Sequence, residues 1–141
     1  PDFTPQDLLS IDNLFRPNTI ATADARSAKN AAPVYTYLLN WKSPVEDNNK
    51  GAFHGLDVPL VFNNIELGKH WTGTSAEAVA VAQHMSDAWI NFAKTGNPNH
   101  KNLPKWPAYA TSNGATLIFD RQIKLLNNHD RQLMQLIKSY P

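Results

Sequence analysis

The spacing of apolar residues predicts one long helix over about residues 75–95. Its apolar residues recur every three or four positions, which places them on one face of a helix: Ala78, Val81, Ala82, Met85, Trp89, Phe92 and Ala93. Thr74 and Glu77 have the spacing of an N-terminal capping box. Gly96 and Pro98 are typical of a helix end. This helix is the most clearly indicated element of the chain.

Three apolar runs predict strands. Residues 34–39 are β-branched, aromatic and apolar on both faces, which is typical of a strand buried inside a sheet. Residues 115–119 and 123–126 predict two short strands joined by a tight turn. Only the first run is of the buried, parallel type, and one such strand cannot form a parallel sheet by itself. We therefore expect the tail of an α/β domain whose remaining strands lie upstream.

The other elements have weaker signals. Residues 8–15 predict a short helix, residues 19–31 a weakly amphipathic one, and residues 63–73 a loop. Asn128 can cap a last helix over 129–140, where apolar residues again recur at helical spacing. The predicted order is helix, strand, loop, helix, hairpin and helix, without an internal repeat.

Composition and charge exclude several classes of protein. The chain has 141 residues, of which 42% are hydrophobic and 18% charged, so it is neither disordered nor fibrous. Its net charge is +1, with no long basic run, which gives no electrostatic reason to expect nucleic acid. No apolar run approaches the roughly 18 residues of a membrane-spanning helix. The chain begins at Pro1 rather than Met, and we expect it to be part of a longer protein.

The segment Gly51–Phe62 carries the candidate chemistry. It places one histidine, His54, before Gly55 and between two apolar runs. Glycine lets the backbone turn closely, so a single titratable side chain is presented beside a packed core. A general base that serves a buried nucleophile is presented in this way. Taken alone, the pattern fits a structural histidine in a turn better than a catalytic one.

Metal chemistry is not indicated. The absence of cysteine excludes thiolate metal sites, disulfides and a cysteine nucleophile within the chain. The remaining histidines do not pair at a spacing of two, three or four residues with one another: His70, His84, His100 and His129. His84 with Asp87 three residues on is better explained as a surface pair.

Five motifs, in one order, resemble the type-B carboxylesterase family, which includes the cholinesterases. They are Ala32–Tyr37, Gly51–Phe62, Met85–Asn99, Leu103–Tyr109 and Thr116–Asp120. The first resembles a late strand of the esterase sheet, the second its histidine loop, and the third its long C-terminal helix with a Thr-Gly-x-Pro-Asn exit. The resemblance implies an α/β-hydrolase fold with a serine nucleophile, a histidine base and usually a glutamate that orients the histidine. It identifies residues 1–141 as a single C-terminal segment of that domain, with an incomplete sheet.

The resemblance implies that His54 is the catalytic histidine and that the serine and the acid lie upstream, outside this chain. Asp57 stands where the family usually carries glutamate, as an acid near the triad rather than the triad acid itself. An equal alternative is that Asp57 caps a short helical turn over 58–62; a direct orienting role toward His54 is less favoured.

Further pocket candidates flank the histidine. The neighbours of His54 in the sequence are Phe53, Gly55 and Leu56. We expect Phe53 and Leu56 to lie mostly in the core. Of the two, Leu56 is the better candidate for contact with substrate. The sequence Gly73–Glu77 partly resembles the glycine-flanked serine elbow of such enzymes. It lacks the second glycine and opens a helix without a preceding strand, so we predict a helix cap instead.

The resemblance implies hydrolysis of a small-molecule carboxylic ester through an acyl-enzyme, without metal or organic cofactor. The 141 residues alone are expected to be inactive, to expose apolar surface where the missing sheet would pack, and to need the remainder of the esterase chain. The alternative is a non-catalytic adhesion or scaffold protein of the same fold.

Two further expectations concern assembly and location. In some relatives the helices that correspond to 75–95 and 129–140 pair in a homodimer, although packing against the body of the same enzyme is the preferred interpretation. The lack of cysteine slightly favours a cytoplasmic esterase over a secreted or periplasmic one.

Overall fold

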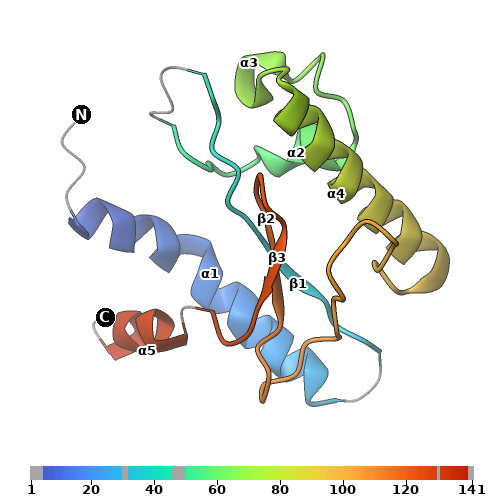
Figure 1. The fold of residues 1–141 in the computed structure, drawn as a ribbon. Coiled ribbons are helices and arrows are strands. Elements are labelled where there is room, and N and C mark those ends of the chain that lie inside the picture. Colours follow the sequence, from blue (N-terminus) through green and yellow to red (C-terminus); the bar gives the residue numbers. More distant parts are fainter. Residues whose placement is uncertain (1–4, 30–31, 46–49, 130, 140–141) are drawn as a thin grey trace.

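The computed structural model describes residues 5–29, 32–45, 50–129 and 131–139 (Figure 1). Eight helices and strands lie in these ranges, in the order α1 (Pro5–Ser27), β1 (Thr36–Leu39), α2 (Asp57–Val61), α3 (Lys69–Thr72), α4 (Ala76–Thr95), β2 (Thr116–Phe119), β3 (Lys124–Leu126) and α5 (Arg131–Ser139). None of the helices described is long and apolar enough to span a membrane.

The three strands form one sheet in the order β1-β2-β3. Strand β2 is antiparallel to β3, which confirms the predicted hairpin. Strand β1 is parallel to β2, with Thr36 opposite Thr116 and Leu39 opposite Phe119. The expectation that β1 has no parallel partner within this chain was therefore wrong. A four-residue apolar run such as β2 does not indicate the direction of the strand beside it.

Strand β1 was predicted to lie inside the sheet, but it lies at an edge of the sheet described here. All four of its residues are half-buried, and its second edge pairs with no other described strand. The apolar residues on both faces of β1 are consistent with a sheet that is incomplete in this chain.

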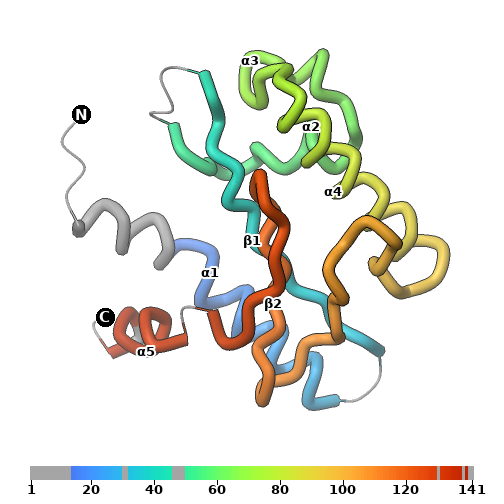
Figure 2. Tube along the Cα trace, in the orientation of Figure 1, coloured from blue at the N-terminus to red at the C-terminus, as the bar shows by residue number. Residues whose placement is uncertain are grey.

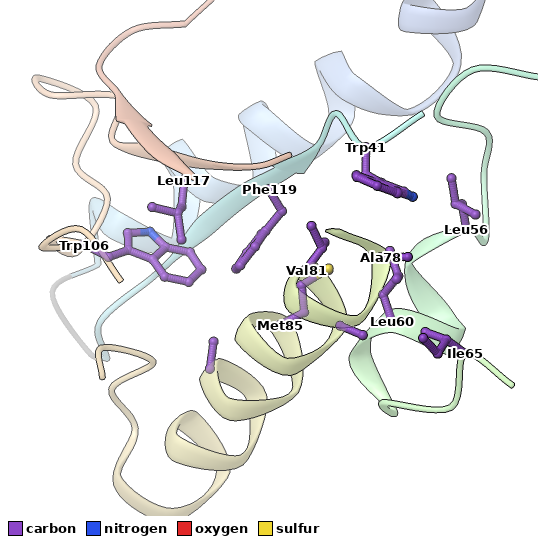
Figure 3. Packing of buried hydrophobic residues seen from close by; sticks show 12 residues of the cluster. Trp41, Leu56, Leu60, Ile65, Ala78, Val81, Met85, Trp106, Leu117 and Phe119 are labelled. Atoms are coloured by element: carbon purple, nitrogen blue, oxygen red, sulfur yellow. The ribbon is translucent and has the colours of Figure 1, made fainter. Parts of the chain in front are cut away.

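Helices cover both faces of the sheet. Figure 1 shows α1 and α5 on one side, and α4 with the short helices α2 and α3 on the other. Leu117 and Phe119 of β2 pack with Val81 and Met85 of α4 in one buried cluster (Figure 3). Ile118 is also buried and points to the opposite face, because successive strand residues alternate in direction.

The buried cluster continues from the sheet to the segment that carries His54. Its members have exposed fractions below 9%: Trp41, Leu56, Leu60, Ile65, Ala78, Val81, Ala82, Met85, Ala88, Trp106, Leu117 and Phe119. Leu56, just before α2, and Leu60, on α2, are completely buried, and Leu60 lies against α4 (Figure 3). Helix α2 and the turn before it are therefore anchored to the same core as the sheet.

Helix α4 confirms the strongest sequence prediction and corrects its details. The first cap is Ser75 rather than Thr74, since the Ser75 hydroxyl oxygen accepts the Ala78 N–H at 3.2 Å. Gly96 ends the helix with a left-handed backbone, φ 74°. Phe92 was predicted on the packed face but is 46% exposed. In the last turn of α4, the ring of Phe92 lies nearly perpendicular to that of Tyr35, with centroids 6.0 Å apart, and is not covered by the sheet.

Helix α1 differs from the two helices predicted over 8–15 and 19–31. It is one helix, Pro5–Ser27, with Pro17 inside it. Proline removes one backbone hydrogen bond and usually ends or kinks a helix. The Pro17 ring is buried, so its packing offsets part of that loss. Tertiary packing, which local sequence does not reveal, decides this element.

Two smaller corrections concern 63–73 and the last helix. The predicted loop contains the one-turn helix α3, Lys69–Thr72, which is too short to show a periodic pattern. The last helix is confirmed as Arg131–Ser139, and its predicted final position lies outside the described residues. Asn128 has a left-handed backbone, φ 51°, instead of the extended one typical of an N-cap.

Candidate active site around His54

His54 lies on a tight turn between the carboxyl end of β1 and the start of α2. In Figure 2, residues 50–56 lead into α2 beyond the end of β1. Two backbone hydrogen bonds close the turn around His54, from Leu56 N–H to the Phe53 carbonyl and from Val58 N–H to the Gly55 carbonyl, each 3.2 Å. Gly55 has φ 88°, a backbone conformation that side chains with a Cβ rarely adopt.

The chain that leads into the turn is also fixed. Ser43 is completely buried, and its N–H donates to the Gly51 carbonyl at 3.0 Å. The Ser43 hydroxyl donates to the carbonyl of Trp71 at 2.6 Å, next to the end of α3. The turn is therefore supported before His54 by Ser43 and after it by the buried Leu56.

The His54 side chain itself is exposed. One face of its ring stacks on Phe15 of α1, with ring centroids 4.6 Å apart and ring planes 13° apart. Among the described residues, none hydrogen-bonds to its imidazole. Sequence analysis did not select Phe15 as a site residue. The feature that marks it in the structure is a large apolar side chain on α1 that is 50% exposed.

Asp57 is held by a tyrosine of the sheet. The hydroxyl of Tyr37, on β1, donates to Asp57 Oδ2 at 2.8 Å. Burial, and then this hydrogen bond to Asp57, raises the pKa of the Tyr37 hydroxyl well above its usual range. The alternative in which Asp57 caps α2 was wrong: Asp57 is the first helical residue, and the cap position Leu56 makes no side-chain cap bond.

The structure places the pocket candidates in or beside the core. Leu56 is completely buried, and Phe53 is half-buried with its ring edge-on to Trp71, at a centroid distance of 5.8 Å. Their contact with a substrate stays a prediction. The elbow-like sequence forms a helix cap as expected, although the capping residue is Ser75 and not Thr74.

A second group of polar residues lies away from His54. A cleft of about 250 Å³ between α4 and the β2–β3 turn includes Glu77, His84 and Asp120 among its lining residues, but not His54. The ring of His84 stacks on His100 with centroids 6.0 Å apart. The predicted pair of His84 with Asp87 is present only as an electrostatic influence of Asp87 on the pKa of His84, since Asp87 accepts its hydrogen bond from Gln83. Within the described ranges, no three His, Cys, Asp or Glu side chains are grouped so as to hold a metal ion.

Comparison with known proteins places this geometry in context. The chain matches the family model described as carboxylesterase family over residues 6–136. It is 36% identical over 126 residues to para-nitrobenzyl esterase of Bacillus subtilis (strain 168), which is 88% of this chain and 25% of that protein. It is 33% identical over 114 residues to phenmedipham hydrolase of Pseudarthrobacter oxydans, which is 76% of this chain and 22% of that protein.

Solved structures show the same similarity. An esterase from anaerobic Clostridium hathewayi, which can hydrolyze aliphatic aromatic polyesters, superposes with a TM-score of 0.85 at 35% identity. The superposition covers 100% of this chain and 28% of that one. The chain thus spans about a quarter of the length of these two curated relatives.

Proposed function

Because this chain belongs to the carboxylesterase family, we propose that it is the C-terminal, histidine-bearing part of a serine esterase in which His54 is the general base. Its structural neighbours are esterases of the α/β-hydrolase fold, and its three-stranded sheet is an incomplete part of that fold. The serine nucleophile, the acid that orients His54 and the oxyanion hole would come from the remainder of the protein.

The observation that carries this proposal is the way His54 is presented. A glycine turn, closed by two backbone hydrogen bonds, holds an exposed imidazole after the carboxyl end of a strand that has a parallel neighbour. Ligands of open α/β sheets bind outside the carboxyl ends of the parallel strands. A triad histidine needs both ring nitrogens, one for the serine and one for the acid, and no described residue occupies either.

The chemistry follows from this position. His54 would take the proton of the serine hydroxyl as the serine oxygen attacks the ester carbonyl carbon. It would return that proton to the leaving alcohol when the ester bond breaks and the acyl-enzyme forms. It would then take a proton from water as the water oxygen attacks the acyl carbon, and give that proton to the serine oxygen when the acyl bond breaks, which releases the carboxylic acid and restores the serine. These steps balance without a metal or an organic cofactor.

The surroundings of His54 favour an apolar ester. Phe15 covers one face of the imidazole, so the reacting groups approach His54 along its ring edge. The phenyl ring, half-exposed beside the base, offers an apolar wall to the acyl or alcohol group.

Fluorophosphonate labelling tests the proposal, because the reagent phosphonylates only a serine that a neighbouring base has activated. The full-length parent should be labelled, and His54→Ala should abolish the labelling. His70→Ala, which changes another exposed histidine, is the matched control and should be labelled like the wild type. The 141-residue chain alone should remain unlabelled.

Two results would contradict the proposal. Equal labelling of the wild type and of His54→Ala would remove His54 from the mechanism. No labelling of the wild-type parent would favour the alternative, a non-catalytic adhesion or scaffold protein of this fold.

A further inference from the structure

We propose that Tyr37 is a positioning residue for His54 and acts through its hydrogen bond to Asp57. The inference rests on the proposed function of His54 as general base. In the described part of the chain, the Tyr37–Asp57 bond of 2.8 Å is the one side-chain hydrogen bond that joins the sheet to the segment 53–57. It connects the middle of β1 to the first residue of α2, three positions after His54.

The Tyr37 hydroxyl has a fixed position, because three elements hold its ring. Tyr37 lies on β1, and its ring packs edge-on against Trp89 of α4, with centroids 4.8 Å apart and planes at 82°. It also packs edge-on against Phe119 of β2, at 6.1 Å and 73°. Such perpendicular pairs define the orientation of aromatic rings. The hydroxyl is therefore a rigid donor that belongs to the sheet and to α4 together.

The hydrogen bond from Tyr37 fixes Asp57, and Asp57 in turn fixes the backbone turn that carries His54. The turn has few residues, and the Leu56 and Val58 N–H groups close it by bonding back to the carbonyls of Phe53 and Gly55. A rotation of the Asp57 backbone therefore changes the direction in which His54 points. A misplacement of a catalytic group by about 1 Å can lower a reaction rate on the order of 100-fold.

The Tyr37 hydroxyl keeps its proton, and so remains a hydrogen-bond donor, at neutral and mildly alkaline pH. The pKa of Tyr37 is raised, so its hydroxyl stays protonated while an imidazole titrates. An ionised Asp57 carboxylate can only accept hydrogen bonds, which fixes the direction of the bond. The Tyr37 hydroxyl is therefore the donor of this hydrogen bond and the Asp57 carboxylate its acceptor.

A second tyrosine–aspartate pair in the chain provides a matched control. The Tyr109 hydroxyl donates to Asp24 Oδ1 at 2.8 Å, the same length as the Tyr37–Asp57 bond. It joins the segment before β2 to α1 and does not touch the turn of His54. The substitution Tyr109→Phe therefore removes the same chemical bond near the end of α1, away from Phe15 and from the turn that carries His54.

The test uses the full-length parent with p-nitrophenyl acetate as substrate. Fluorophosphonate titration counts the active sites of each preparation, so that kcat is obtained per active site and misfolded molecules do not enter it. Tyr37→Phe should lower kcat roughly tenfold with little change in KM. Tyr109→Phe should leave kcat per active site and KM unchanged, although both substitutions lower the melting temperature.

Variants of Asp57 test the route of the effect. Asp57→Ala should lower kcat at least as much as Tyr37→Phe does, and adding Tyr37→Phe to it should lower kcat no further, since the two residues act as one unit. Asp57→Asn keeps an acceptor oxygen for the Tyr37 hydroxyl and should cost less than Asp57→Ala.

Each contrary result has a distinct meaning. An unchanged kcat per active site in Tyr37→Phe would overturn the positioning role. A further loss when Tyr37→Phe is added to Asp57→Ala would overturn the route through Asp57. If the wild type is not labelled, or if His54→Ala is labelled normally, the proposed function itself fails and the positioning role with it.

Discussion

The ring of His54 stacks on Phe15 of α1, the helix that precedes β1 in the sequence. The two ring planes are 13° apart and the centroids 4.6 Å apart. A phenyl ring in this position restrains the imidazole and also attracts it in its protonated form, since the ring face carries negative charge. Helix α1 therefore contributes to the site, although its sequence gave no candidate residue.

Replacing Phe15 should weaken catalysis without unfolding the protein. In the full-length parent, we expect Phe15→Ala to lower kcat/KM for an ester by up to about tenfold, because an aromatic pair contributes about 0.5–1.5 kcal/mol. The neighbouring Leu14→Ala is the control, since Leu14 is 66% exposed and has no ring to stack on His54. Equal losses in the two variants would show that the stacking itself does not matter.

The backbone of Gly55 should be essential to the site. Its φ of 88° is strained for any residue with a Cβ, while the space around that Cβ is open. Gly55→Ala is therefore expected to cost about 1–2 kcal/mol of stability and to turn His54 away, with a large loss of kcat. Gly51→Ala has a similar strain, φ 58° with open space, but lies before the turn. We expect it to destabilise similarly and to retain more kcat per active site; the reverse order would contradict this reading of the turn.

The core beneath the turn should dominate stability. Leu60 is completely buried between α2 and α4, and Leu60→Ala should lower the free energy of unfolding by about 2–5 kcal/mol. Denaturant titration of the full-length parent, followed by tryptophan fluorescence, measures this loss. Lys69→Ala, at an exposed position of α3, should change the free energy by less than about 0.5 kcal/mol. A small effect of Leu60→Ala would mean that α2 is not anchored in solution.

The outer face of α2 should make the isolated chain associate. Val58 and Phe62 lie one helical turn apart and are 53% and 74% exposed. We expect the 141-residue chain to form dimers or larger species, and Phe62→Glu to shift the distribution toward monomer. Light scattering after size-exclusion chromatography measures the mass of each species. A monodisperse wild-type monomer would contradict this expectation.

Stability should fall in mild acid because of His84. Burial lowers the pKa of His84 below its ordinary 6.5, the neighbouring His100 lowers it further, and Asp87 opposes them. The unfolded chain therefore binds this proton more readily, so stability is complete above about pH 6.5 and declines as the pH falls below it. We expect the melting temperature of His84→Asn to fall less than that of the wild type when the pH is lowered from 7.5 to 5.5. His70→Asn is the control, and identical pH dependence in all three proteins would exclude His84 as the cause.

Local signals in the sequence predicted the elements that depend on local interactions. The apolar spacing from Ala78 to Trp89 and the left-handed Gly96 place α4, and the two apolar runs of the hairpin place β2 and β3. His54 was identified because a glycine turn and a resemblance coincide in one segment. These features need no knowledge of what lies elsewhere in the fold.

Contacts between distant segments were not predictable in the same way. The pairing of β1 with β2, the continuation of α1 through Pro17 and the stacking of Phe15 on His54 each depend on how separate elements pack. The acid at Asp57 was expected near the site, but its partner Tyr37 was not. A hydrogen bond between a strand and a helix end has no periodic signature in the sequence.

The parallel pairing of β1 with β2 makes the support of His54 self-contained. The segment that carries the base leaves the sheet at β1 and, after α4, returns to the adjacent strand β2. If His54 is the general base, as proposed, the base lies on a unit whose strands pair with each other, and we expect the rest of the protein to pack against the second edge of β1 and the outer surfaces of this unit. We expect that exchanging the segment from β1 to β3 between related esterases would transfer the histidine together with the strands and helices that support it. The receiving protein would need a strand that pairs with the second edge of β1 and a surface that fits this unit. The backbone around His54 would need no redesign.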